Sequence, residues 1–138
     1  MIAAAVQWKM EDERGRTVLA SVRRAAGFWS RGRGWMARRD PAESGLWLSP
    51  CGSIHTGFMR FSIDAYFLDR EHRIVRIRRD LHPWRMAVGG RRAASVVETR
   101  SGALAPGALK EGDVVRLTRI SPNRAAAHGR QCCPPESA

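Results

Sequence analysis

Five polar or amphipathic side chains stand inside otherwise apolar segments of the sequence, and they are the first candidates for chemistry. They are His55, Arg60, Asp64, Trp84 and Arg85. If these side chains converge at one sheet edge, they form a small pocket for an anionic or sugar-like ligand. A buried carboxylate at Asp64 needs a cation or several donors, so a structural ion pair with Arg60 or Arg85 is the simpler explanation at that position.

The sequence predicts no catalytic residues, no metal site and no cofactor. A nucleophile needs a base within hydrogen-bond reach and a group that orients the base, and the chain has no G-x-S-x-G or Cys/His signature. Cys51 and His55 would lie on one face of an extended strand, but about 13 Å apart at ~3.3 Å per residue. The repeated spacing Cys51-x3-His55 and His128-x3-Cys132 is no recognised zinc finger. We therefore favour a protein that is not an enzyme, with a hydrolase or transferase as a third alternative.

The charge balance suggests a second class of function. The chain has 24 Lys+Arg against 13 Asp+Glu and a formal net charge of +11. A positive net charge of this size favours binding to nucleic acid, because Lys and Arg side chains that neutralise phosphates release the counterions bound there. The arginines are nevertheless spread along the chain, whereas nucleic-acid binders more often concentrate them. Nucleic-acid binding is thus the alternative, and its predicted basic surface comprises Arg76, Arg78, Arg79, Arg91 and Arg92.

These side chains must be positioned by one small domain, because 138 residues fall within the usual single-domain range. We expect a loose lead-in over residues 1–15, one domain over 16–120 and a disordered tail over 121–138, where no large apolar side chain is available for a core. Three cysteines form no even disulfide framework, and the N-terminus lacks a basic region before its short apolar patch. We expect a cytoplasmic protein without a membrane span.

Hydrophobic patterning inside the domain favours short strands. A strand over 17–22 leads into one short helix over 23–31, and Gly45–Leu48 is a short buried strand. From Ser53 onward large apolar groups occur on both faces of an extended chain, which predicts a strand covered on both sides. Further strands are expected over 63–68, 74–78, 94–99 and 114–120, the first two forming a hairpin. The expected fold is mainly β, a compact antiparallel barrel or sandwich of the jelly-roll kind with one short N-terminal helix.

A set of motifs in this order resembles the DUF192 family, also called the UPF0127 proteins. The central block, which starts at Ser53-Ile54-His55-Thr56 and continues through Met59-Arg60-Phe61-Ser62-Ile63-Asp64 to Asp69, is the specific part. The flanking motifs are Arg33-Gly34-Trp35-Met36, Gly45-Leu46-Trp47-Leu48, Val96-Val97-Glu98, Gly102 and Leu109-Lys110-Glu111-Gly112-Asp113. The resemblance implies a small β-rich domain of the jelly-roll or barrel kind, in a family without an established biochemical activity.

Two positions depart from the family pattern. Ser62 stands where the family usually has Pro, and Glu98-Thr99-Arg100-Ser101-Gly102 replaces a more usual E-L-P-A-G. A lost proline mainly relaxes the backbone, so the fold should survive while a ligand site near Phe61 is weakened. Our leading hypothesis is a non-enzymatic, cytoplasmic domain that binds a small anionic or sugar-like ligand, or a protein partner, through the region of His55, Arg60, Asp64, Trp84 and Arg85.

Overall fold

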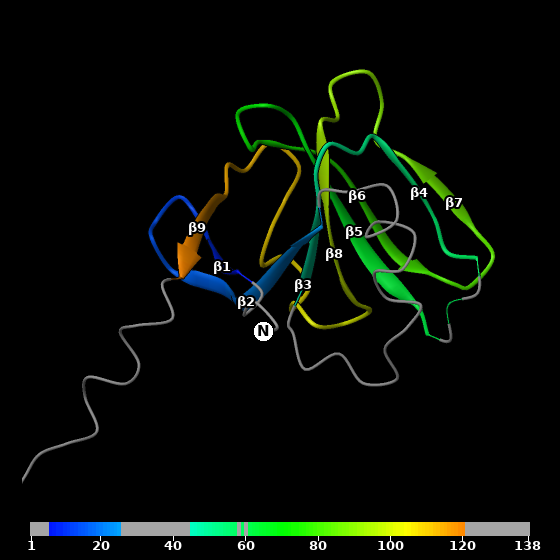
Figure 1. Ribbon diagram of the computed structural model, residues 1–138, viewed down its shortest axis with the longest axis horizontal. Coiled ribbons are helices and arrows are strands. Elements are labelled where there is room, and N and C mark those ends of the chain that lie inside the picture. Colours follow the sequence, from blue (N-terminus) through cyan, green and yellow to red (C-terminus); the bar gives the residue numbers. More distant parts are fainter. Residues whose placement is uncertain (1–5, 26–44, 58, 60, 121–138) are drawn as a thin grey trace, which may run out of the picture.

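Nine strands build the part of the chain that the structure, a computed structural model, describes (Figure 1). The described residues are 6–25, 45–57, 59 and 61–120. In chain order the strands are β1 (Gln7–Glu11), β2 (Thr17–Ala25), β3 (Gly45–Leu48), β4 (Ser53–His55), β5 (Ile63–Leu68), β6 (Ile74–Leu81), β7 (Met86–Val88), β8 (Ser95–Arg100) and β9 (Arg116–Ile120).

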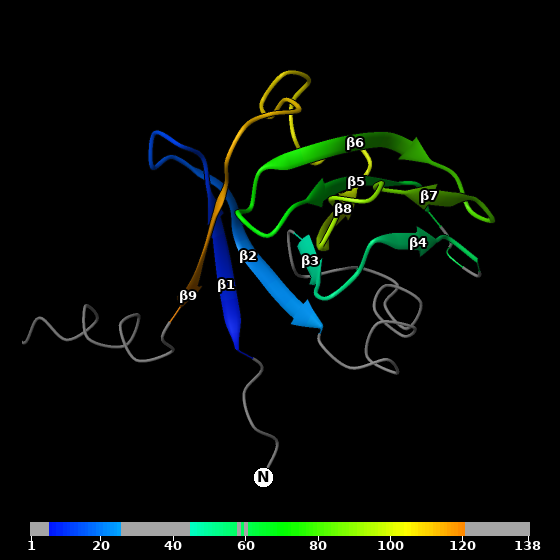
Figure 2. The ribbon, with the colours of Figure 1, turned by 90° about the horizontal axis from the view of Figure 1, so that it is seen from above.

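The strands form one large sheet and one small one. The large sheet has seven strands in the order β6-β5-β8-β3-β2-β1-β9, and the small sheet is the pair β4-β7. All neighbours are antiparallel except β2 and β3, which run parallel. Figure 2 shows the β4–β7 pair as a second layer beside β5, β8 and β3.

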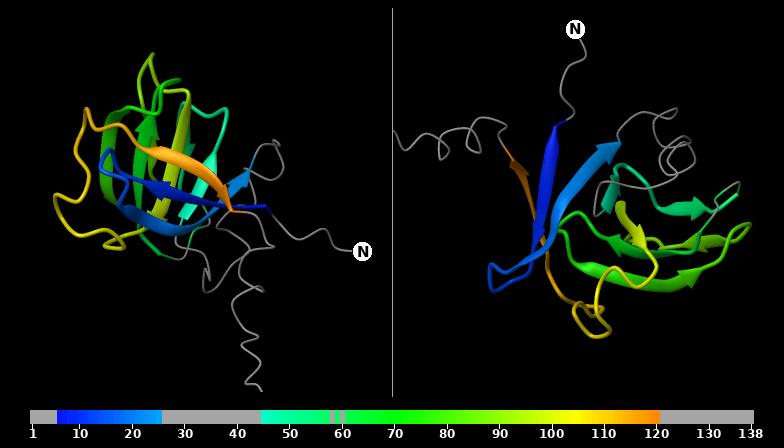
Figure 3. Two further views of the ribbon diagram at one scale, coloured as in Figure 1. Left: turned by 90° about the vertical axis from the view of Figure 1, so that its left-hand side faces the viewer. Right: turned by 90° about the horizontal axis from the view of Figure 1, so that it is seen from below.

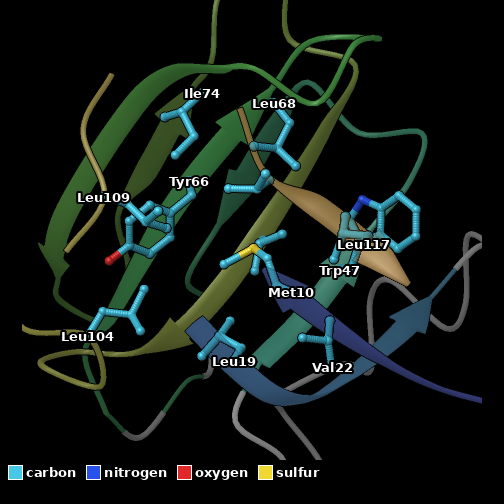
Figure 4. Close-up of a cluster of buried hydrophobic side chains, with 12 residues drawn as sticks. Met10, Leu19, Val22, Trp47, Tyr66, Leu68, Ile74, Leu104, Leu109 and Leu117 are labelled. Atoms are coloured by element: carbon cyan, nitrogen blue, oxygen red, sulfur yellow. The ribbon is translucent and has the colours of Figure 1, made fainter. Parts of the chain in front are cut away.

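The central strands β5 and β8 are buried on both faces, because alternate side chains of each strand pack into different clusters. Tyr66, Leu68 and Val97 enter a first cluster with residues of β1, β2 and β9 (Figure 4). Phe67 and Val96 enter a second cluster, which also contains Ile54 of β4 and Ala87 of β7. The small sheet is therefore held against the large one by apolar packing.

The large sheet curls without closing into a barrel (Figure 3). Its outermost strands, β6 and β9, do not pair with each other. The segment before β9 instead makes one isolated bridge between Val114 and Arg73, supported by a hydrogen bond from the Ile74 amide to the Asp113 carbonyl. The mainly β class is confirmed, whereas the expected closed barrel is wrong.

Several local expectations change. Residues 23–25 continue β2, so the predicted helix is wrong there, and its remainder over 26–31 lies outside the described residues. Residues Gln7–Glu11, expected within a loose lead-in, form β1 between β2 and β9. The strand expected to be covered on both sides is only Ser53–His55, with Ile54 buried and its two neighbours exposed. The predicted tail over 121–138 lies outside the described residues as well.

No helix occurs in the described ranges, and correspondingly none there has the length and apolar character needed to cross a membrane.

Because β5 is buried on both faces, neighbouring residues that point to opposite faces should be equally sensitive to substitution. Phe67 and Leu68 are both fully buried, in different clusters. We expect Phe67→Ala and Leu68→Ala each to lower the free energy of unfolding by about 2–5 kcal/mol, because each leaves a cavity in its cluster. Urea denaturation measures this loss. Exposed Arg78 is the control, since Arg78→Ala should change stability by less than about 0.5 kcal/mol. If Phe67→Ala or Leu68→Ala left the stability unchanged, the sheet could not be packed on both faces.

Candidate functional site

The five candidate residues do not meet at one point. His55, Trp84 and Arg85 lie at the β4–β7 pair and the loop before β7, and all three are exposed. Asp64 lies in β5 with only 2% of its surface exposed. Arg60 is outside the described residues. The predicted site thus divides into an exposed part and a buried part, each with its own contacts.

The buried part is a carboxylate that holds backbone amides. The Asp80 amide, at the end of β6, donates to Asp64 Oδ1 at 2.8 Å, and the Gly102 amide, in the turn after β8, donates to Oδ2 at 3.2 Å. These two donors satisfy one oxygen each, so the buried charge is compensated by fixed dipoles. Asp64 therefore ties the ends of β6 and β8 to β5.

The described cation beside Asp64 is Arg79, which was expected on the basic surface and not as a partner of Asp64. Its guanidinium lies 3.9 Å from Asp64 Oδ2 and 5.8 Å from the ring centroid of Tyr66. Burial raises the pKa of the Tyr66 phenol above its ordinary value of 10.0, and the nearby Arg79 charge partly offsets that rise. Arg85, one of the two partners proposed from the sequence, contacts Thr56 through its backbone amide and carbonyl.

A second buried polar group, Thr56, fixes the loop between β6 and β7. Its hydroxyl donates to the His82 carbonyl at 2.6 Å and accepts from the Arg85 amide at 2.8 Å. Its own amide donates to the Arg85 carbonyl, and its carbonyl accepts from the Trp84 amide. Because Thr56 is fully buried, these bonds are shielded from water and pin the loop to the end of β4.

This loop holds Trp84 in an uncommon backbone conformation. Its φ is 66°, in the left-handed region that bulky side chains avoid at a cost of about 1–2 kcal/mol. Gly57 lies between the two rings of the exposed part, since a β-carbon added there would sit 3.3 Å from His55 Nδ1 and 3.7 Å from Trp84 Cζ3. His55 and Trp84 are therefore neighbours across a residue that has no side chain.

Apolar side chains extend this exposed part along β7. Met86 pairs with His55 and Val88 pairs with Ser53, while Ala87 between them faces the core. The exposed fractions are 66% for Trp84, 75% for Met86 and 52% for Val88. We call His55, Trp84, Met86 and Val88 together the β4–β7 face.

The five arginines of the alternative basic surface have different surroundings. Arg76 donates to the Val88 carbonyl at 2.9 Å, and Arg79 faces Asp64. Arg78, Arg91 and Arg92 are exposed.

The structure also adds residues that the sequence analysis missed. Thr56, Met86 and Val88 were not candidates, although Met86 and Val88 have the i, i+2 spacing that places side chains on one face of a strand. That spacing was the available signal for the exposed face. Thr56 carried no comparable signal, because its partners are main-chain groups 26 and 29 residues away.

Metal ligands are not gathered anywhere in the ranges that the structure describes, where no three His, Cys, Asp or Glu side chains lie close enough to hold an ion. Of the zinc-like spacing in the sequence, residues 128 and 132 lie outside those ranges.

Comparison with known protein families shows which family this chain belongs to. The model of the DUF192 family, described as "Uncharacterized ACR", matches residues 9–117 of the 138. The chain belongs to the DUF192 family. The resemblance noted in its central block is thereby confirmed, and the match includes both Asp64 and the β4–β7 face. No curated protein matches this DUF192 chain.

Two solved structures are similar to this DUF192 protein. One, from Sinorhizobium meliloti 1021 and described as a proposed transcription regulator, has a TM-score of 0.69 at 20% sequence identity. The other, a protein of unknown function from Novosphingobium aromaticivorans DSM 12444, has a TM-score of 0.68 at 18% identity. Each comparison covers 83% of this chain and 94% of the other. At these identities the likeness concerns the fold alone.

The geometry at Asp64 predicts that backbone donors matter more than the ion pair. We expect Asp64→Ala to lower the free energy of unfolding by about 3 kcal/mol, because two amides lose a charged acceptor. Arg79→Ala should cost less than about 1 kcal/mol, because the Arg79 side chain is 38% exposed and its charge is screened. Urea denaturation of both variants decides the point, and equal losses would show that the ion pair dominates.

The bonds of Thr56 predict a cost that its volume does not explain. Thr56→Val keeps the shape but leaves the His82 carbonyl and the Arg85 amide without this hydroxyl, so we expect a loss of about 1–3 kcal/mol. Thermal and urea unfolding measure it. The matched control is Thr118→Val in β9, where the threonine is half-buried and a change within about 0.5 kcal/mol is expected. A neutral Thr56→Val would mean that the hydroxyl adds nothing to the hold of packing and of the main-chain bonds of residue 56.

Proposed function

We propose that this DUF192 domain is a binding module for a protein partner and that the β4–β7 face is its binding surface. The observation that carries the proposal is the exposure of Trp84, Met86 and Val88, which are three of the four exposed large hydrophobic residues among those described. A contiguous apolar patch on a soluble domain is typical of an interaction site.

High exposure favours a macromolecular partner over a small ligand. Small-molecule sites are concave and bury most of the ligand surface. The side chains of this face instead project, with exposed fractions between 52% and 75% for the three apolar residues. Projecting Trp and Met side chains are typical of the centre of a protein–protein interface, where each inserts into a pocket of the partner.

The backbone at Trp84 supports the same proposal. Its left-handed φ of 66° is maintained by hydrogen bonds of the Trp84 and Arg85 amides to buried Thr56. Strain of this kind persists only where the surrounding structure fixes it, and it gathers at functional sites. A rigid indole also loses little conformational entropy on binding.

Charge indicates the chemistry of the partner. Arg85 is exposed next to the face, and the whole chain carries a net charge of +11. A partner with acidic side chains around an apolar residue would be attracted at long range and retained by apolar contact. Aspartate and glutamate beside an apolar anchor are therefore the expected features of the bound segment.

Nucleic-acid binding is the weaker alternative. Arg78, Arg91 and Arg92 are exposed, which leaves part of the predicted basic surface open to solvent. Arg76 and Arg79 are already engaged by a carbonyl and a carboxylate, which reduces the number of cations ready to meet phosphates. The fold likeness to a protein described as a proposed transcription regulator adds no weight, because it rests on 20% identity. For either function we propose the cytoplasm as the compartment.

Selection from a random peptide library on the immobilised full-length chain tests the proposal. We expect enriched peptides to carry an apolar residue flanked by Asp or Glu, and Trp84→Ala to weaken their binding by roughly 30-fold, the value of about 2 kcal/mol for an aromatic anchor. The matched control is Val6→Ala, which removes the fourth exposed apolar side chain and should leave affinity unchanged.

Three outcomes would contradict this function. The first is an absence of enriched peptides, and the second is equal binding of the peptides by Trp84→Ala and the wild type. The third is binding of a generic DNA duplex at about 50 mM salt that weakens steeply with added salt and is lost when Arg78, Arg91 and Arg92 become Ala, which would favour the nucleic-acid alternative.

A further inference from the structure

Three polar side chains at one end of the large sheet form a series of close contacts that the β4–β7 face does not use. Ser62 Oγ lies 3.1 Å from His82 Nδ1, and His82 Nε2 lies 3.4 Å from Asp80 Oδ2. Ser62 precedes β5, while Asp80 and His82 lie at the end of β6 and just beyond it. A hydroxyl, an imidazole and a carboxylate thus follow one another in the order of a nucleophile, a base and a group that orients the base.

The carboxylate selects the useful tautomer of the imidazole. A carboxylate accepts a hydrogen bond only from a ring N–H, so of the two neutral tautomers of His82 the one with its proton on Nε2 suits the contact with Asp80. Nδ1 is then an unprotonated acceptor directed at the Ser62 hydroxyl. In this tautomer Ser62 donates its proton toward a base, which is the arrangement that activates a serine.

Hydrogen bonds to neighbouring groups, two of them buried, hold each member of the series in place. Asp64 accepts the Asp80 amide at 2.8 Å, and Thr56 donates to the His82 carbonyl at 2.6 Å. The Ser62 carbonyl accepts the Ser101 amide at 3.0 Å, and the Ser101 hydroxyl donates to Asp80 Oδ1 at 3.1 Å. Asp80 keeps a φ of 53°, a left-handed conformation that Asp tolerates better than most residues. The backbone under all three side chains is therefore fixed, which is a requirement for a reactive array.

We infer that Ser62 is an acyl-accepting nucleophile, with His82 as its base and Asp80 as a positioning residue, and that activated esters are its substrates. In the reaction Ser62 Oγ attacks the ester carbonyl carbon while its proton passes to His82 Nδ1. The bond from the carbonyl carbon to the alcohol oxygen breaks, and His82 returns the proton to that leaving oxygen. The products are acyl-Ser62 and a free alcohol or phenol, and no further reactant is consumed.

Exposure determines which substrates are accessible. The side chains of His82 and Asp80 are 66% and 62% exposed, so a small ester reaches the array directly from solvent. An open site does not exclude water and supplies little stabilisation through a low dielectric. A good leaving group such as p-nitrophenolate compensates for that, so p-nitrophenyl acetate is the appropriate probe.

The test incubates the full-length chain with p-nitrophenyl acetate and follows both nitrophenolate release and the acetylated residue by peptide mass spectrometry. We expect acetyl-Ser62, and a rate at Ser62 that falls about 100-fold in His82→Ala, the lower end of general-base effects. Asp80→Glu should retain more of the rate than Asp80→Asn, because only the former keeps a carboxylate. All of these side chains are at the surface or partly exposed, and the melting temperature of each variant shows that it folds.

Ser101 is the matched control serine. Its hydroxyl donates to the same Asp80 carboxylate, and this hydrogen bond involves no imidazole. Ser101 should stay unacetylated under the conditions that label Ser62.

Acetylation of Ser62 that is unchanged in His82→Ala, or no faster than at Ser101, would overturn the inference. Nitrophenolate release that persists in Ser62→Ala with no serine adduct in the wild type would overturn it as well, because His82 would then act alone. None of these results bears on peptide binding, since Trp84 and Met86 take no part in the reaction.

Discussion

A carboxylate buried inside a β-sheet needs hydrogen-bond donors, and the donors of Asp64 fix the ends of two strands of this domain. Its two oxygens accept the amides of Asp80, at the end of β6, and of Gly102, in the turn after β8. The alternative to these bonds is an uncompensated charge in the core, which is far more costly than an ordinary lost hydrogen bond. The ends of β6 and β8 are consequently fixed relative to β5.

Thr56 fixes the next segment of the chain in the same way. Asp64 holds the end of β6 at Asp80, and Thr56 holds the loop that follows it at His82 and Arg85. The backbone that carries the exposed side chains of this loop is thereby fixed. Both the apolar β4–β7 face and the Ser62, His82 and Asp80 series depend on this loop, so two buried polar residues support two separate surface chemistries.

The sequence predicted the parts of the fold that depend on local pattern. The β5–β6 hairpin followed from alternation and a polar connection, and it is confirmed. The short strands β1 and β7 were missed because they are stabilised by pairing and by the clusters that they cover. Of the site residues, His55 and Trp84 do lie together, but the donors of Asp64 are backbone amides 16 and 38 residues away. Backbone amides occur at almost every position, so composition and spacing carry no information about them.

Amide hydrogen exchange of the wild-type protein tests the central claim most directly, because it reports each donor separately. Asp80, Gly102, Trp84 and Arg85 are exposed residues whose amides donate to the buried Asp64 or Thr56. We predict that these amides exchange slowly, close to the rates of the β5 core, while the amide of Arg92 in the neighbouring exposed turn exchanges fast. Fast exchange at Asp80 and Gly102, comparable to that at Arg92, would contradict the view that a buried carboxylate holds this end of the molecule.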